Sequence, residues 1–166
     1  NDMQMNFLVL GLTALVPLVI GMLWYNPKVF GTAWMKACGF TDSEKMKEGF
    51  NMPLVFGLTL VFGFLMAMIL QSCVIHQVAI GQLTMHFKDD PTTKAEIASL
   101  MTKYGNEFRD FRHGVIHGGI LGVFLIFPII AINALFERKS WKYILVNTGY
   151  WLVTLMIMGG IICRFA

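Results

Sequence analysis

The chain has 166 residues, of which 56% are hydrophobic and only 14% are charged, whereas a soluble domain carries about 25% charged residues. The charges leave four long stretches almost free of them, so the composition argues against a soluble globule and predicts an all-α, polytopic membrane protein. The net charge of +3 is spread over the loops, with no basic run interleaved with aromatic residues, so we expect the lipid bilayer and not nucleic acid as a partner.

The four uncharged stretches are each close to the ~20 residues that an α-helix needs to cross the core of a bilayer. We therefore expect one transmembrane domain, 1–166, built as a four-helix bundle. The spans lie at about residues 6–25, 53–75, 115–136 and 143–163. Pro17 and Pro128 fall inside the first and third spans and predict kinks, because neighbouring helices can satisfy the backbone groups that each proline frees.

The first loop, 26–52, predicts an amphipathic helix that lies in the membrane interface. In KVFGTAWMKACGF, the apolar residues fill one arc of a helix and the polar residues fill another, namely Val29, Phe30, Ala33, Trp34, Ala37 and Cys38 against Lys28, Thr32 and Lys36. Thr41 and Glu44 then form a T-x-x-E capping box, which predicts a short following helix.

The middle loop, 76–114, also predicts a helix outside the membrane. Asp90 followed by Pro91 is typical of a helix start, and Gly105 is typical of a helix end. Between them, apolar residues repeat at i, i+3, i+4 and i+7, at Ile97, Leu100, Met101 and Tyr104. This stripe predicts an amphipathic helix that folds onto the transmembrane bundle.

The segment FRDFRHGVIHGGILG (108–122) opens the third span with a regular repeat of small residues. Gly114, Gly118 and Gly122 are spaced by four and so lie on one helical face. Association of helices in lipid depends on close van der Waals approach, which glycines at this spacing permit. The repeat therefore predicts that this face packs closely on another helix, within the chain or between subunits.

The same segment brings together polar side chains that suit a metal or proton site. Asp110, His113 and His117 are spaced by three and four, and His76 leaves the second span on the same side of the membrane. Neutral imidazoles with a carboxylate suit a transition metal. The alternative, which we favour, is that the histidines only form hydrogen bonds at the membrane interface.

Polar residues near the last turn predict one interhelical pair. Asn133 in the third span and Asn147 in the fourth lie at similar depths on either side of a turn near residue 140. We expect their carboxamides to form a hydrogen bond between the two helices.

Two segments, one near each end of the chain, carry a family resemblance. GMLWYNPKVFGTAWMKACGFT (21–41) contains G-x-L-W-Y-x-P-x-x-F-G-x-x-W, and NALFERKSWKYILVNTGYWLVTLMIMGGII (133–162) contains an F-E-R turn followed by V-N-x-G-Y. Together they resemble the bacterial family named domain of unknown function seventeen-sixty-one. The resemblance implies a small four-span membrane protein and no activity, because the family has none assigned. The middle loop is longer than the linker that the family leads us to expect.

Basic residues in the loops predict the orientation in the membrane. The first loop carries four lysines, and the third loop, 137–142, packs Arg138, Lys139 and Lys142 into six residues. Loops rich in lysine and arginine stay cytoplasmic. We therefore expect a multi-pass protein of the inner (plasma) membrane, with both termini and the 76–114 loop on the non-cytoplasmic side.

The sequence favours a non-enzymatic membrane protein without a cofactor, which forms a homo-oligomer or serves as an accessory subunit of a membrane complex. No Asp, Glu, Lys or Arg lies in the central part of any span, which argues against an ion-coupled transporter with its site in one protomer. No Ser-His-Asp set, P-loop or dinucleotide fingerprint is present, and the three cysteines are widely spaced. The alternative is a channel, transport or metal-handling protein that uses the histidine-rich side.

Overall fold

The computed structural model describes residues 6–40, 49 and 51–166, and the described residues are helical with no β-strand among them. The α-helices are α1 (Phe7–Thr13), α2 (Val16–Trp24), α3 (Thr32–Cys38), α5 (Met52–Val74), α6 (Gln77–Leu83), α7 (Pro91–Tyr104), α8 (Phe111–Leu121), α9 (Phe127–Phe136) and α10 (Trp141–Phe165). Two π-helical turns, η1 (Pro27–Gly31) and η3 (Gly122–Ile126), and a 3₁₀ turn, η2 (Met85–Phe87), complete the described structure.

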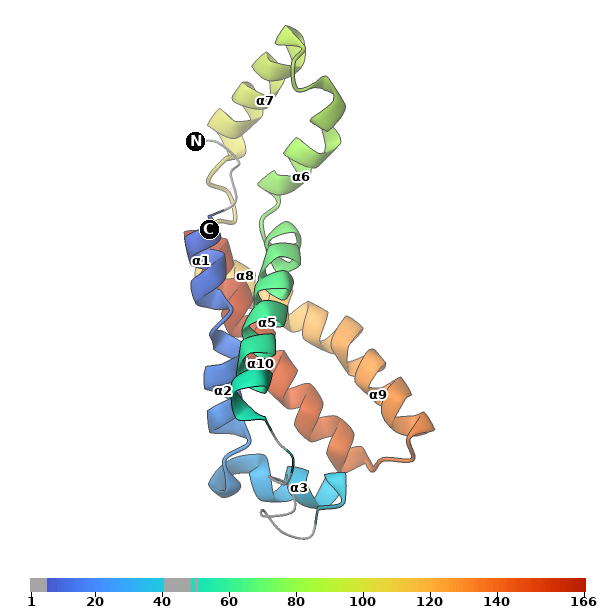
Figure 1. Ribbon diagram of the computed structural model, residues 1–166. Coiled ribbons are helices and arrows are strands. Elements are labelled where there is room, and N and C mark those ends of the chain that lie inside the picture. Colours follow the sequence, from blue (N-terminus) through green and yellow to red (C-terminus); the bar gives the residue numbers. More distant parts are fainter. Residues whose placement is uncertain (1–5, 41–48, 50) are drawn as a thin grey trace.

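Among the residues that the structure describes, four helical segments are long and apolar enough to cross a membrane, at Phe7–Trp24, Met52–Val74, Phe111–Phe136 and Trp141–Phe165. They confirm the predicted all-α bundle with four spans (Figure 1). The third helix begins at Phe111 rather than near residue 115, so the middle loop ends at Asp110. The reason is local: the Asp110 carboxylate accepts the backbone N–H of His113 at 3.0 Å and caps the helix before its apolar run begins.

Both prolines within the spans lie at kinks. In the first span, α1 and α2 are separated by Ala14 and Leu15, which keep right-handed helical backbone angles, and Pro17 stands in the first turn of α2. In the third span, η3 precedes α9, in which Pro128 occupies the first turn. Proline has no N–H to donate and its ring clashes with the preceding turn, so the helix widens or breaks just before it.

The closest helix contact in the described structure joins α8 to α10. A Cβ atom added at Gly114 would overlap the carbonyl oxygen of Gly159, and one added at Gly118 would overlap the carbonyl oxygen of Leu155. A Cβ at Gly122 would lie 2.7 Å from a methyl carbon of Leu152. The glycine face predicted from the sequence thus packs within the chain, against the last span.

The remaining spans close the bundle around this pair of helices. A fully buried apolar cluster runs from Leu10 in α1 through Leu70 and Val74 in α5 to Met158 and Ile162 in α10. Gly63 of α5 allows a second close approach, since a Cβ there would lie 2.8 Å from the carbonyl oxygen of Ala14. These contacts hold α5 against the first span and against α10.

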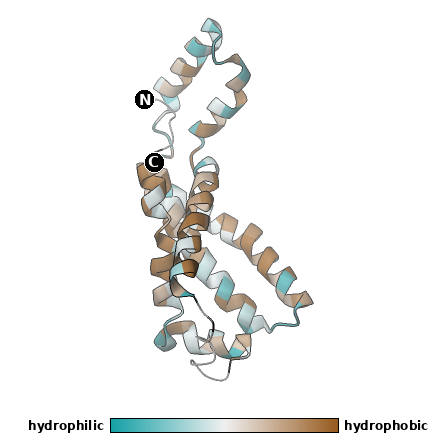
Figure 2. Ribbon diagram, in the orientation of Figure 1, coloured by the Kyte–Doolittle hydropathy of each residue, from teal (hydrophilic) through white to brown (hydrophobic). Residues whose placement is uncertain are grey.

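Helices α6 and α7 form an arm that projects beyond the ends of the spans, as Figure 1 shows. The predicted helix at 91–104 is present as α7, but the prediction that it folds onto the bundle is wrong. No residue of α7 is buried, and α7 packs beside α6 instead. The reason is that residues 77–83 form a helix of their own, which carries the chain away from the bundle and gives α7 a neighbour. Figure 2 shows more hydrophilic residues on the arm than on the spans.

The opposite end of the bundle carries the predicted helix of the first loop. It begins with η1, in which Asn26 O accepts the N–H of Gly31 at 2.9 Å, and continues as α3. Figure 1 shows α3 lying across the ends of the spans. The predicted capping box of Thr41 and Glu44, and the short helix after it, lie outside the described residues.

The contact between α8 and α10 predicts that neighbouring glycines differ sharply in their tolerance of a side chain. Gly118→Ala should lower the free energy of unfolding by about 1–3 kcal/mol, because the added methyl group collides with the backbone of α10. Gly119→Ala is the matched control, since its nearest neighbour would be Met156 Cγ at 3.7 Å. Unfolding in detergent, followed by circular dichroism, measures both. Equal stability of the two variants would contradict the contact.

Candidate functional site

Three histidines from two parts of the chain meet at one end of the bundle. Ring nitrogens of His76, His113 and His117 all lie within 4.8 Å of one another. The ring centroids are 4.9 Å apart for His76 and His113, 5.1 Å for His76 and His117, and 4.4 Å for His113 and His117. Nε2 of His113 lies 2.9 Å from Nε2 of His76, a hydrogen bond in which one nitrogen donates and the other accepts.

Local structure explains why these rings converge. His113 and His117 are four residues apart on α8, so they share one face of that helix beside the glycines that contact α10. His76 follows Ile75, whose extended backbone ends α5, and immediately precedes α6. Because α5 ends beside the first turns of α8, the His76 ring reaches the other two. His76 is exposed, whereas the other two rings are half-buried.

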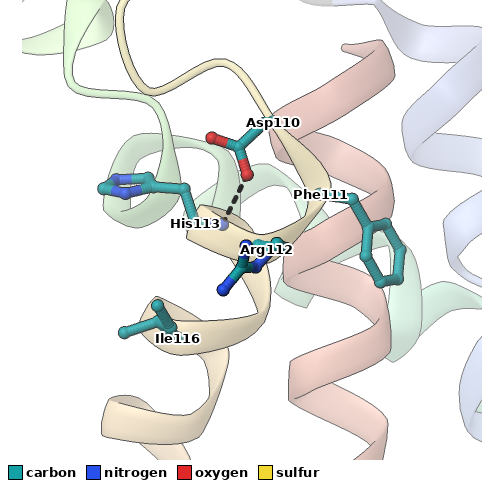
Figure 3. A pocket seen from close by; sticks show the side chains of 5 residues that line it. All are labelled: Asp110, Phe111, Arg112, His113 and Ile116. Atoms are coloured by element: carbon teal, nitrogen blue, oxygen red, sulfur yellow. Dashed lines mark hydrogen bonds between the residues drawn. The ribbon is translucent and has the colours of Figure 1, made fainter.

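Asp110 does not join the histidines, so the expectation that it could be a ligand is wrong. Its carboxylate accepts the backbone N–H of His113 at the start of α8, as the dashed line in Figure 3 shows. The same figure shows Phe111 pointing toward α10, where its ring covers Gly160. Capping uses Asp110 because the first N–H groups of a helix have no partner within the helix.

Three residues that the sequence did not single out contact the rings or the segments that carry them. Phe108 has a left-handed backbone, with φ of 60°, and its ring lies 5.0 Å from the ring of His113 and 5.8 Å from that of His76. The Cys163 thiol lies 3.2 Å from the carbonyl oxygen of Phe108 and 3.4 Å from that of Val74. The buried Gln77 donates to the carbonyl oxygens of Tyr104 and Glu107, at 2.7 and 2.9 Å. No spacing or motif in the sequence pointed to these contacts.

The arrangement offers three nitrogen ligands to one ion. A tetrahedral ion with metal–nitrogen bonds of about 2.0–2.1 Å holds its ligand nitrogens about 3.3 Å apart. The 2.9 Å separation between His76 and His113 would widen by a few tenths of an ångström, and the third nitrogen lies within 4.8 Å. The rings would therefore have to rotate and draw together by up to about 1.5 Å to place all three nitrogens around one ion.

A second polar cluster lies at the other end of the bundle, around Tyr25. Its hydroxyl donates to Oδ1 of Asn147 at 2.9 Å, while Nδ2 of Asn147 donates to the carbonyl oxygen of Tyr143 at 2.8 Å. The indole N–H of Trp24 donates to the carbonyl oxygen of Val146 at 3.0 Å. Burial, assisted by the nearby Tyr150, raises the pKa of Tyr25, so its hydroxyl stays protonated and remains a donor.

The predicted pair of Asn133 and Asn147 is not formed. Both polar atoms of the Asn147 side chain bond to the two tyrosines, and Asn133 lies exposed on α9. The wide turn η3 lies between the start of the third span and Asn133. A π-helical turn inserts one extra residue and rotates every following side chain by about 100°, so similar depth no longer implies facing directions.

The two clusters sit at opposite ends of a four-span helical membrane protein whose first and last spans are tied together by aromatic residues. A Cβ at Gly149 would lie 2.6 Å from the Trp24 ring, and one at Gly21 would lie 3.7 Å from the Tyr150 ring.

The chain belongs to the family described as protein of unknown function (DUF1761), which matches residues 8–163. No curated protein and no solved structure matches it.

Because the two asparagines differ in their contacts, their replacement should have different effects. Asn147→Ala should destabilise the fold by about 0.6 kcal/mol and at most about 1.7 kcal/mol, the average and the maximum measured for hydrogen bonds between membrane helices. Asn133→Ala, the matched control, should leave stability unchanged because its side chain is exposed. Unfolding of both variants in the same detergent measures the difference. A larger effect at Asn133 would contradict the assignment of Asn147 to Tyr25.

Proposed function

We propose that the protein is a non-enzymatic membrane protein that binds one divalent transition-metal ion through His76, His113 and His117. The observation that carries this proposal is the approach of their ring nitrogens to within 4.8 Å of one another. A histidine pair on one helix occurs often by chance, but the third ring comes from a residue 37 positions away. The fold therefore builds the cluster from separate elements.

The ligand chemistry narrows the kind of ion. Three neutral imidazoles suit zinc, copper(II), nickel and cobalt, whereas magnesium and calcium require oxygen ligands and copper(I) prefers sulfur. A tetrahedral ion would keep one position free for water or another exchangeable ligand. Because His76 is exposed, this position suits capture and release of an ion at the membrane surface.

The second candidate function is an assembly role, as a homo-oligomer or as an accessory subunit of a membrane complex. It is favoured by apolar side chains at the tip of the arm, where Leu83, Met85 and Phe87 are 81%, 60% and 63% exposed. These residues lie outside the four spans, so the lipid that covers the spans does not account for them. The glycines of α8 do not support an assembly role, because they pack on α10 within the chain and not on another subunit.

The proposal places the protein in the inner (plasma) membrane, with the histidines, the arm and both termini on the non-cytoplasmic side. One support is the density of basic residues in the third loop, which favours the cytoplasmic side for that loop. A second is that Trp24, Trp34 and Trp141 gather at the end of the bundle that carries the first and third loops. In this orientation the cluster would meet ions from outside the cytoplasm.

Metal binding is tested with purified protein that is titrated with Co²⁺ or Zn²⁺. We expect one ion per chain, a Co²⁺ absorption band of a low-coordinate site, and at least roughly tenfold weaker binding for His117→Ala, because one ligand is lost. Binding should also weaken from about pH 7.5 to about pH 5, because an imidazole binds metal only when neutral.

His86→Ala is the control for this titration, since His86 lies in η2 on the arm and is not part of the cluster. It should bind the ion as the wild type does. Native mass spectrometry of the same samples reports both the bound metal and the number of chains. A stable oligomer that takes up no metal would replace our proposal with the assembly role.

The orientation is tested by labelling a cysteine in the third loop. With Cys38 and Cys73 replaced by Ala, Glu137→Cys should not react with an impermeant thiol reagent in intact cells, because we place this loop in the cytoplasm. Asp89→Cys, on the arm, should react. The reverse pattern would invert the proposed topology and place the histidines on the cytoplasmic side.

A further inference from the structure

The arm meets the bundle at the histidine cluster. The chain leaves the bundle through His76, which is the residue directly before α6. It returns through Phe108 and Asp110, which lead into α8 and its two histidines. Both connections therefore pass the three rings, and Phe108 lies against two of them.

The two connections of the arm are held by different contacts. Gln77 closes its base by donating to the carbonyl oxygens of Tyr104 and Glu107. These two bonds join the arm's two connections to each other. The returning connection is also held to the end of α10, because the Cys163 thiol bonds to the carbonyl oxygen of Phe108 and Arg109 donates to the carbonyl oxygen of Ala166. The direct link from the outgoing connection to α8 is the hydrogen bond between His76 and His113, made by an exposed ring.

We propose that an ion in the cluster acts as a clamp that fixes the base of the arm to α8. The inference rests on the proposed metal binding and adds a consequence to it. His113 and His117 belong to α8 alone, whereas His76 belongs to the arm's outgoing connection. An ion held by all three replaces one exposed hydrogen bond by coordinate bonds that span both elements, so the position of the arm depends on metal.

Linkage gives the size of the effect. Any movement that separates His76 from α8 must first release the ion or lose a ligand. Where the separated state holds no ion, binding suppresses it by a factor of one plus the ratio of free ion to its dissociation constant, about 100-fold at a hundredfold excess. The factor is smaller where His113 and His117 still hold the ion. Amide exchange in α6 and in residues 105–110 reports these movements.

The experiment is hydrogen exchange of the full chain in detergent micelles, with and without saturating Zn²⁺. In the wild type, exchange in α6 and residues 105–110 should slow by roughly 10- to 100-fold on addition of the ion. His86→Ala, outside the cluster, should behave in the same way. Occupancy is measured on the same samples, so absence of binding, which would refute the proposed function, is distinguished from binding without a clamp.

Two variants that each keep two histidines make the test sharp. His117→Ala keeps His76 and His113, which connect the arm to α8, and should retain the slowing once saturated with Zn²⁺. His76→Ala keeps only the pair on α8 and should lose the slowing even where it still binds the ion. Metal-bound wild type with unchanged exchange, or equal slowing in both variants, would overturn the clamp.

Discussion

The backbones of α8 and α10 touch at Gly114 and Gly159, and the helices of the other two spans and α9 also contact α10. No side chain separates the two helices there, so their relative rotation and depth are fixed. That rotation directs His113 and His117 to the flank of the contact, toward the end of α5. A polar cluster at one end of the bundle is thus positioned by residues that have no side chain.

The two ends of the bundle are held by different chemistry. At the end that carries α3, aromatic rings and the hydrogen bonds of Trp24 and Tyr25 tie the first span to the last. These residues belong to the motifs that carry the family resemblance, so the motifs mark a joint between distant parts of the chain. At the opposite end, His76 is exposed, His113 and His117 are half-buried, and the Phe108 ring lies against His76 and His113.

Composition and spacing in the sequence predicted the helices and their faces. They did not predict which partner the side chains of Asn133 and Asp110 face. Hydropathy located the four spans, because an uncharged apolar run of about 20 residues has the length and composition of a membrane-spanning helix. Spacing also identified the glycine face and the histidine pair, since four residues always return to the same side of a helix. It failed for Asn133, because the extra residue in η3 turns α9, and for Asp110, because a helix cap competes for its carboxylate.

The pair of helices in closest contact lies wholly within the last third of the chain, which bears on how the protein enters the membrane. The ribosome completes the first two spans long before α10 emerges. During that interval the side chain of Gln71, which is 5% exposed in the finished bundle, has no completed bundle to cover it. Biosynthesis therefore passes through a stage in which a polar surface of the second span must be shielded from acyl chains by water or by the insertion machinery.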